Sequence, residues 1–115
     1  MPKTVWTSPI ASQEIVDGPE VQLRPGKLTI RFSSEDAWHE LSFGEVLKFT
    51  FTEFGACTSD HVAAYDKLLD FGSDSAFARE ALDGARRDVS GLRHFRVFFD
   101  DVGAYDVVAR SAEWS

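Results

Sequence analysis

The sequence predicts an α+β domain built on a mainly antiparallel sheet of about six strands, and three observations lead to this class. Apolar and polar residues alternate along several short segments, as in half-buried strands. Two later segments place their apolar residues at helical spacing. Two further alternating segments near the C-terminus are joined by a short loop that ends in glycine. Strands, then helices, then a closing hairpin are the order typical of an α+β protein.

The first half of the chain predicts an irregular arm followed by a four-strand meander. Residues 1–19 contain Pro2, Pro9 and the turn signal Asp17-Gly18-Pro19, so we expect an irregular N-terminal arm with a short strand around residues 4–7. Alternation from Val21 onward, interrupted by the turn at Pro25-Gly26, predicts strands over residues 21–24, 28–32, 37–43 and 47–52.

Two helices are expected after Gly55. The first would be capped by Ser59 or Asp60 and end at Gly72, with these apolar residues on one face: Val62, Tyr65, Leu68 and Leu69. The second would begin at Ser73 or Asp74, and its apolar face would consist of Phe77, Ala78, Ala81, Leu82 and Ala85. Arg86 and Arg87 would lie in its last turn, where positive charge complements the helix dipole.

The segment from Phe95 to Ala109 predicts a hairpin. A three-residue loop, Asp101-Val102-Gly103, would place Gly103 in the left-handed conformation and pair Phe99 with Tyr105. This register keeps all the apolar side chains of the hairpin on one face.

Composition excludes several classes of protein. The 115 residues contain 12 basic and 19 acidic side chains, a net charge of −7, and one cysteine. A single cysteine excludes an internal disulfide framework, and the acidic balance argues against a nucleic-acid partner. The chain has no apolar run of membrane-spanning length, so we expect no membrane partner and a soluble, cytoplasmic single domain covering residues 1–115.

His39 is the first candidate functional residue. It alternates with Leu41 and Phe43 and so is expected to face the core, where an imidazole needs either a hydrogen-bond partner or a function. With Tyr65 or Tyr105 it could line a ligand pocket between the sheet and the helices. This defines the alternative function, a small enzyme or a ligand-binding domain.

The second face of the hairpin is another candidate. It carries His94 and Arg96 on one strand and Asp106 on the other, with Arg96 expected diagonal to Asp106. The group could orient His94 as a base or bind an anion. It could equally be a cross-strand charge ladder on a solvated face.

The loop from Gly55 to His61 brings together Cys57, two hydroxyls, a carboxylate and an imidazole. Helix capping with a passive Cys57 accounts for these residues, since zinc-ligand spacing is missing. The chain also lacks the common catalytic motifs, so we expect no metal, no cofactor and no assigned catalytic residue.

The predicted helices carry a candidate docking surface. Asp60, Asp66, Asp70 and Asp74 would form an acidic flank, with Asp66 and Asp70 one helical turn apart. Such a surface could bind a basic protein, and Trp114 could serve as an anchor. Self-association through an exposed strand edge or the terminal tryptophans is a further hypothesis.

Two segments carry a resemblance to a known class of proteins. Residues 92–109 resemble the closing hairpin of small bacterial cytosolic proteins of mostly unassigned role. Together with the segment Trp38-His39-Glu40-Leu41-Ser42-Phe43 and the strand that follows it, they are similar to small acidic immunity proteins of bacterial toxin systems. The resemblance implies a compact, non-enzymatic inhibitor that masks a toxin, and it assigns no site residues.

Overall fold

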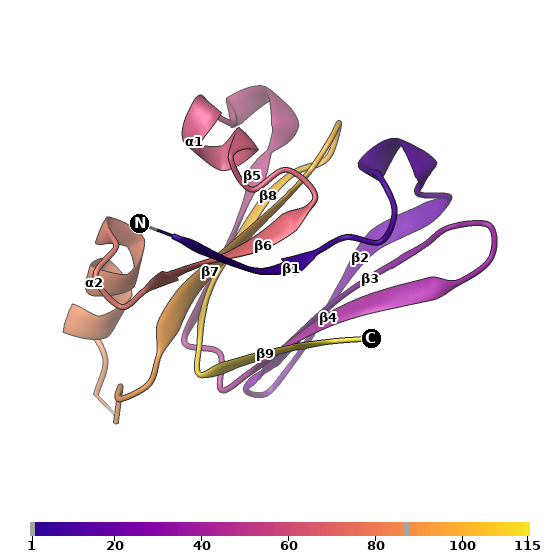
Figure 1. The fold of residues 1–115 in the computed structure, drawn as a ribbon. Helices are drawn as coiled ribbons and strands as arrows, with labels where there is room; N and C mark the ends of the chain where they lie inside the picture. Colours follow the sequence, from indigo (N-terminus) through magenta and orange to yellow (C-terminus); the bar gives the residue numbers. More distant parts are fainter. Residues whose placement is uncertain (1, 87) are drawn as a thin grey trace.

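Two antiparallel sheets form the body of the protein, which is described from a computed structural model covering residues 2–86 and 88–115 (Figure 1). In chain order the elements are β1 (Lys3–Thr7), η1 (Ser12–Glu14), β2 (Asp17–Arg24), β3 (Lys27–Ser33), β4 (Trp38–Gly44), β5 (Lys48–Glu53), η2 (Phe54–Ala56), α1 (Ser59–Val62), β6 (Lys67–Gly72), α2 (Ala76–Asp83), β7 (Arg93–Phe99), β8 (Gly103–Ala109) and β9 (Ser111–Trp114). The expected α+β class with mainly antiparallel sheet is therefore confirmed, but the expected count of about six strands is wrong, because the described residues form nine strands divided between two sheets.

The strand order is β1-β6-β7-β8-β5 in the first sheet and β2-β3-β4-β9 in the second. We call these sheet A and sheet B. Their facing sides enclose the main core, to which Phe32 and Phe43 contribute from sheet B and Phe95 and Phe99 from sheet A. The opposite side of sheet A is covered by α1 and α2, and the helices lie far from β2, β3 and β4 in Figure 1.

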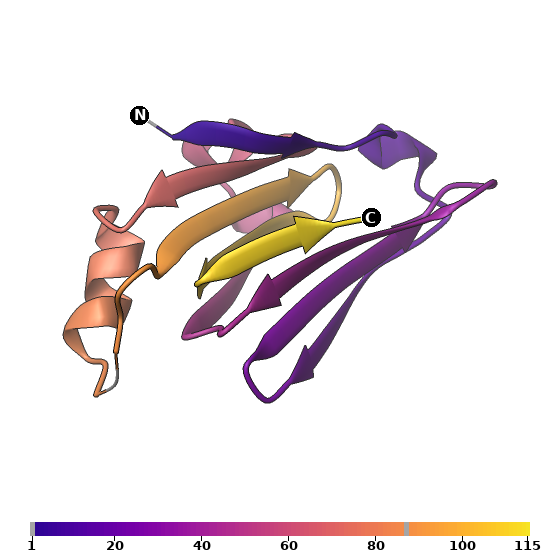
Figure 2. The ribbon, with the colours of Figure 1, turned by 60° about the horizontal axis from the view of Figure 1, so that its bottom comes forward.

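Two segments of the chain bend from one sheet into the other and so join the sheets: β4 continues into β5, and β8 continues into β9. β4 pairs with β9 in sheet B, and their direct continuations, β5 and β8, pair in sheet A. At the bend the amide of Arg110 donates to the carbonyl of Gly44 over 3.0 Å, and the guanidinium of Arg110 pairs with Glu45. Strands that switch sheets in this way form the corners of sandwich folds. Figure 2 shows β9 lying beside β4 at this corner.

The predicted meander is correct for three strands and wrong for the fourth. β2, β3 and β4 pair in sequence, but β5 pairs with β8 instead of β4. The N-terminal arm is also more regular than expected, because β1 pairs with β6 and β2 already begins at Asp17. The short strand expected around residues 4–7 corresponds to β1.

The first predicted helix is wrong over most of its length. α1 contains four residues only, Asp66 adopts a positive φ of 53°, and residues 67–72 form strand β6. Leu68 packs into the core between the sheets, whereas Leu69 packs on the helix-covered side. A strand buried on both faces has a continuous apolar run, which periodicity alone cannot distinguish from a helix.

The second predicted helix is confirmed, with shifted ends. Ser75 caps α2, and Phe77, Ala78, Ala81 and Leu82 pack against sheet A. The helix ends at Asp83, so Arg86 lies beyond its last turn. Arg87 lies outside the described residues.

The C-terminal hairpin forms with the predicted facing of its side chains but with a different register. Val97, not Phe99, lies opposite Tyr105, and Phe99 lies opposite Gly103. The loop therefore consists of residues 100–102, with Asp101 at a φ of 60°. Because the shift is two residues, every side chain stays on its predicted face. Arg96 accordingly lies directly opposite Asp106, and not diagonal to it.

Gly103 is required by close strand packing. A Cβ at Gly103 would lie 2.1 Å from the Thr52 carbonyl oxygen, and its φ is 140°. Gly103→Ala should therefore lower the free energy of unfolding by about 3 kcal/mol in urea denaturation.

Gly26→Ala is the matched control for this substitution. Gly26 also has a positive φ, 72°, but nothing lies within 4 Å of the position that a Cβ would take there. Gly26→Ala should therefore lower the free energy of unfolding by only about 1 kcal/mol. Equal losses in the two variants would show that backbone conformation, and not contact with β5, is what Gly103 supplies.

Candidate functional site

The outer side of sheet A contains a buried chain of hydrogen bonds. His94 Nε2 lies 2.6 Å from Asp106 Oδ1, and His94 Nδ1 lies 2.8 Å from Ser75 Oγ. β7 and β8 place His94 and Asp106 on the same face of the sheet, and the start of α2 supplies Ser75. The sequence predicted His94, Arg96 and Asp106 as a group. It did not single out Ser75, although a serine before an apolar helix is a capping signal.

This face is not solvated, contrary to one of the two interpretations of the sequence. His94 is 2% exposed and Asp106 is 3% exposed. The rings of Phe71 and Phe77 lie 4.8 and 4.7 Å from the imidazole and cover it. Arg96 is the last member of the cluster. Its Nε donates to Asp106 Oδ1 over 2.7 Å, and its guanidinium lies 5.0 Å from the Phe71 ring centre.

Asp106 is held as a carboxylate. Burial by itself would raise the pKa of Asp106, but the hydrogen bond from His94 and the charge of Arg96 outweigh it, so that the pKa lies below its ordinary value. A buried carboxylate with two basic partners satisfies the condition under which a charge can remain inside a protein.

Serine, histidine and aspartate in one hydrogen-bonded chain can activate a hydroxyl group, but the surroundings of this chain do not suit that chemistry. Ser75 Oγ already accepts the amide of Ala78 over 3.1 Å as the cap of α2. The imidazole is covered by aromatic rings, and the main surface hollows among the described residues lie elsewhere. The arrangement therefore fixes the start of α2 on sheet A.

The three residues of the alternative ligand pocket do not meet. His39 faces inward as predicted, and its ring centre lies 5.4 Å from that of Phe32 in sheet B. Tyr105 is buried in the core between the sheets, where burial raises the pKa of its phenol. Tyr65 packs on Phe98 on the opposite side of sheet A.

The four predicted docking carboxylates do not share a helix face. Asp66 accepts the Ser12 amide over 3.0 Å, and Asp70 accepts Arg93 Nε over 2.8 Å, so both are engaged in internal contacts. Asp60 and Asp74 are exposed. The physical reason is that α1 already ends at Val62, Asp66 has a positive φ just before β6, and Asp70 lies in β6.

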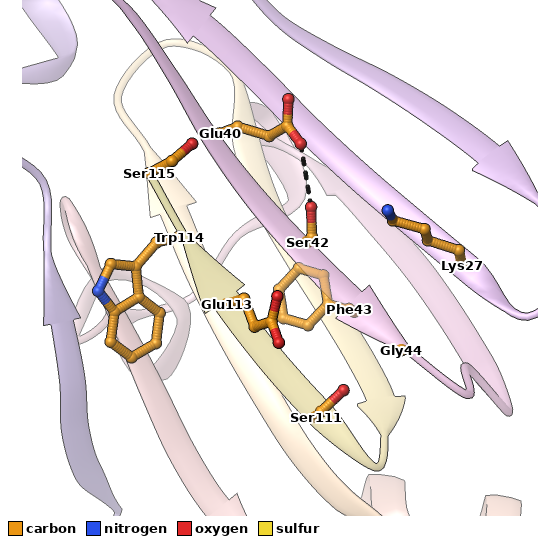
Figure 3. Close-up of a pocket in the computed structure, with 9 residues that line it drawn as sticks. All are labelled: Lys27, Glu40, Ser42, Phe43, Gly44, Ser111, Glu113, Trp114 and Ser115. Atoms are coloured by element: carbon orange, nitrogen blue, oxygen red, sulfur yellow. Dashed lines mark hydrogen bonds between the residues drawn. The ribbon is translucent and has the colours of Figure 1, made fainter.

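Trp114 lies on β9, the last strand of the chain, and is 47% exposed. It borders a shallow groove across β3, β4 and β9, where the side chains of Lys27, Glu40 and Glu113 face solvent (Figure 3). In Figure 3 the indole lies on the other side of β9 from Ser42 and Glu113. Trp6, by contrast, packs edge-on against Phe32 in the core.

A second acidic region, which sequence reasoning missed, surrounds η1. Two adjoining hollows of about 380 and 240 Å³ share Gln13 and Ile15 as lining residues. Five carboxylates from three segments also line them, and we call this region the acidic end: Glu14, Glu35, Asp36, Asp100 and Asp101. Figure 1 shows η1 between the β3–β4 turn and the β7–β8 turn, which supply the other four carboxylates.

Specific hydrogen bonds hold η1 in this position. Ser12 bonds Asp66 and also accepts the amide of Asp100 over 3.1 Å. Gln13 Nε2 donates to Asp100 Oδ2 over 2.9 Å. No sequence pattern indicated this pairing, because the partners are more than 50 residues apart.

Comparisons with known proteins found no matching family model, curated protein or solved structure. Among the described residues no helix is long and apolar enough to cross a membrane.

The buried carboxylate yields a prediction about stability and pH. Asp106→Asn should lower the free energy of unfolding by about 3 kcal/mol at pH 7, because it leaves Arg96 without its charged partner. Since the folded pKa is depressed, the wild-type contribution is complete above the unfolded pKa of about 3.9 and is lost as pH falls through the folded pKa. The difference between wild type and variant should therefore shrink in acid.

Urea denaturation of both proteins between pH 7 and pH 3 measures this difference. Asp36→Asn, at an exposed turn, is the control and should change stability by less than about 0.5 kcal/mol. A difference for Asp106→Asn that stays constant over the pH range would contradict the role given to its charge.

Proposed function

We propose that the protein is a non-enzymatic module that binds a basic segment of a partner protein at its acidic end. The observation that carries the proposal is the convergence of five carboxylates around η1. Four of them belong to exposed residues, while Asp100 is partly buried and accepts hydrogen bonds from Gln13 and Tyr65. Among the described residues that line the two hollows there is no lysine or arginine. Complementary charge of this kind speeds encounter with a basic partner and disfavours acidic ones.

The acidic end also offers apolar contact. Val16 is 60% exposed beside Glu14, and Ile15 and Val102 are partly buried in the floor of the hollows. Interfaces typically combine an apolar centre with a polar, charged rim. The bound segment would therefore present one apolar side chain flanked by lysine or arginine.

An immunity-type inhibitor of a basic toxin is the specific form of this function that the sequence resemblance suggests. It is supported by the acidic end and by the net charge of −7. The sequence-based docking surface is less well supported, because Asp66 and Asp70 are bound internally. The alternative of a ligand pocket near His39 gains no support from the placement of Tyr65 and Tyr105.

Charge neutralisation at the acidic end tests the proposal. The triple variant Glu35→Gln, Asp36→Asn and Asp101→Asn should weaken binding of a fluorescent lysine-rich peptide with one central leucine by about tenfold at low salt. All three side chains belong to exposed residues, so the fold should be retained. Fluorescence anisotropy measures the affinity, which should fall as salt is raised.

The double variant Asp60→Asn and Asp74→Asn is the matched control, since it removes exposed carboxylates from the sequence-predicted surface. It should leave the affinity within about twofold of wild type. If the control weakens binding and the triple variant does not, the docking surface lies on α1 and α2 and the proposal is wrong. Unchanged binding in both variants would also contradict it.

A further inference from the structure

One side of the sandwich exposes apolar side chains that face inward. Val21, Leu23 and Phe51 lie opposite the buried residues Ile30, Leu28 and Tyr105, and cross-strand neighbours share a face of the sheet. Yet they are 40%, 64% and 44% exposed. The reason is that β2 and β5 are the outermost strands of their sheets, with no described strand beyond them.

We call this side, formed by β2 and β5, the open edge. It contains a hollow of about 520 Å³ lined mainly by apolar residues, including Leu23, Val46 and Phe49. Contiguous exposed apolar surface of this kind marks sites of association.

Among the described residues no strand pairs with the outer edge of β5, on which the Glu53 carbonyl accepts the Cys57 thiol over 3.4 Å. The register of β5 with β8 runs unbroken from Lys48 to Glu53, without a bulge. β2, in contrast, carries an irregularity between Asp17 and Glu20 and contains Pro19. Bulges and prolines protect edge strands from pairing, and β5 has neither.

Charge is distributed asymmetrically along the open edge. At one end the exposed Arg24 lines the hollow. Lys48 lines it as well, but its ammonium is paired with Glu80 over 3.6 Å and lies over the Phe77 ring of α2, so Arg24 supplies the charge at this end. At the other end are the exposed carboxylates of Glu20 and Glu53. Residues next to them, Pro19 and Phe54, each approach Val102, which places these two acids at the same end.

From this arrangement we propose that the open edge binds a second copy of the chain around a twofold axis, with β5 paired antiparallel to its equivalent. A twofold axis reverses the direction of the edge, so Arg24 of each copy meets Glu20 and Glu53 of the other, once on either side of the axis. Val21, Leu23 and Phe51 of the two copies form the apolar centre, while the charges fix orientation and register. The interface uses none of the five carboxylates of the acidic end.

Sedimentation velocity over a concentration series tests the dimer. Wild type should pass from monomer to dimer as concentration rises, and Leu23→Glu should raise the dissociation constant at least about tenfold. Val62→Glu is the matched control, because Val62 is 45% exposed on α1, away from the open edge, and it should dimerise like wild type. Wild type that remains monomeric up to about 1 mM would overturn the proposal.

Charge reversal tests the orientation independently of the apolar centre. Arg24→Glu leaves acidic residues at both ends of the open edge, and the double variant Glu20→Lys and Glu53→Lys leaves basic residues at both ends. Each variant alone should dimerise less than wild type. An equimolar mixture of the two should restore the dimer, because each contact then joins opposite charges. A mixture that stays as monomeric as its components would contradict the twofold arrangement. Unchanged peptide binding by Leu23→Glu would show that the two proposals stand separately.

Discussion

The carboxylate of Asp106 is the interaction on which the arrangement of layers depends. It lies on β8 in sheet A, a strand whose residues are all buried, and it has hydrogen bonds with His94 and Arg96 on the neighbouring strand. His94 carries the connection on to Ser75, so a charge in the sheet determines where helix α2 begins. Arg96 extends it in the other direction, to the carbonyl of Asp60 in α1. A buried charge of this kind requires all its partners at once, which favours one position of the helices on the sheet.

The path of the strands determines which surfaces remain for binding. β4 and β8 each continue across the corner into the other sheet, which joins the two sheets where these strands bend. Among the described residues no strand lies beyond β2 or β5, so the side formed by these two strands stays open. The helices occupy the outer face of sheet A, and the outer face of sheet B presents mixed charges around Lys27, Glu40 and Glu113. The surface with charge of a single sign is therefore the acidic end, and exposed apolar side chains gather at the open edge.

Sequence patterns predict the elements that bury one face, and they fail where burial is two-sided or contacts are distant. Strands β3 and β4 alternate apolar with polar side chains because their apolar side chains all point to the core on one face of sheet B, and α2 has a single apolar stripe. The spacing predicts a helix over β6 because Leu68 and Leu69 are both buried, on opposite faces. Gly103 looks like a turn residue alone, because the close approach of Thr52 depends on a strand some 50 residues away in the chain. The acidic end escapes prediction for the same reason, since its carboxylates come from three separate segments.

A double-mutant cycle between Ser75 and Asp106 tests the central claim that one buried chain of hydrogen bonds joins sheet to helix. His94 lies between the two side chains and bonds each of them through a different ring nitrogen. The free energies of unfolding of Ser75→Ala, Asp106→Asn and the double variant give the coupling. If His94 transmits the interaction, the double variant should lose less stability than the sum of the single losses, by about 1 kcal/mol or more. Losses that add to within about 0.3 kcal/mol would show that the helix cap and the buried carboxylate act separately.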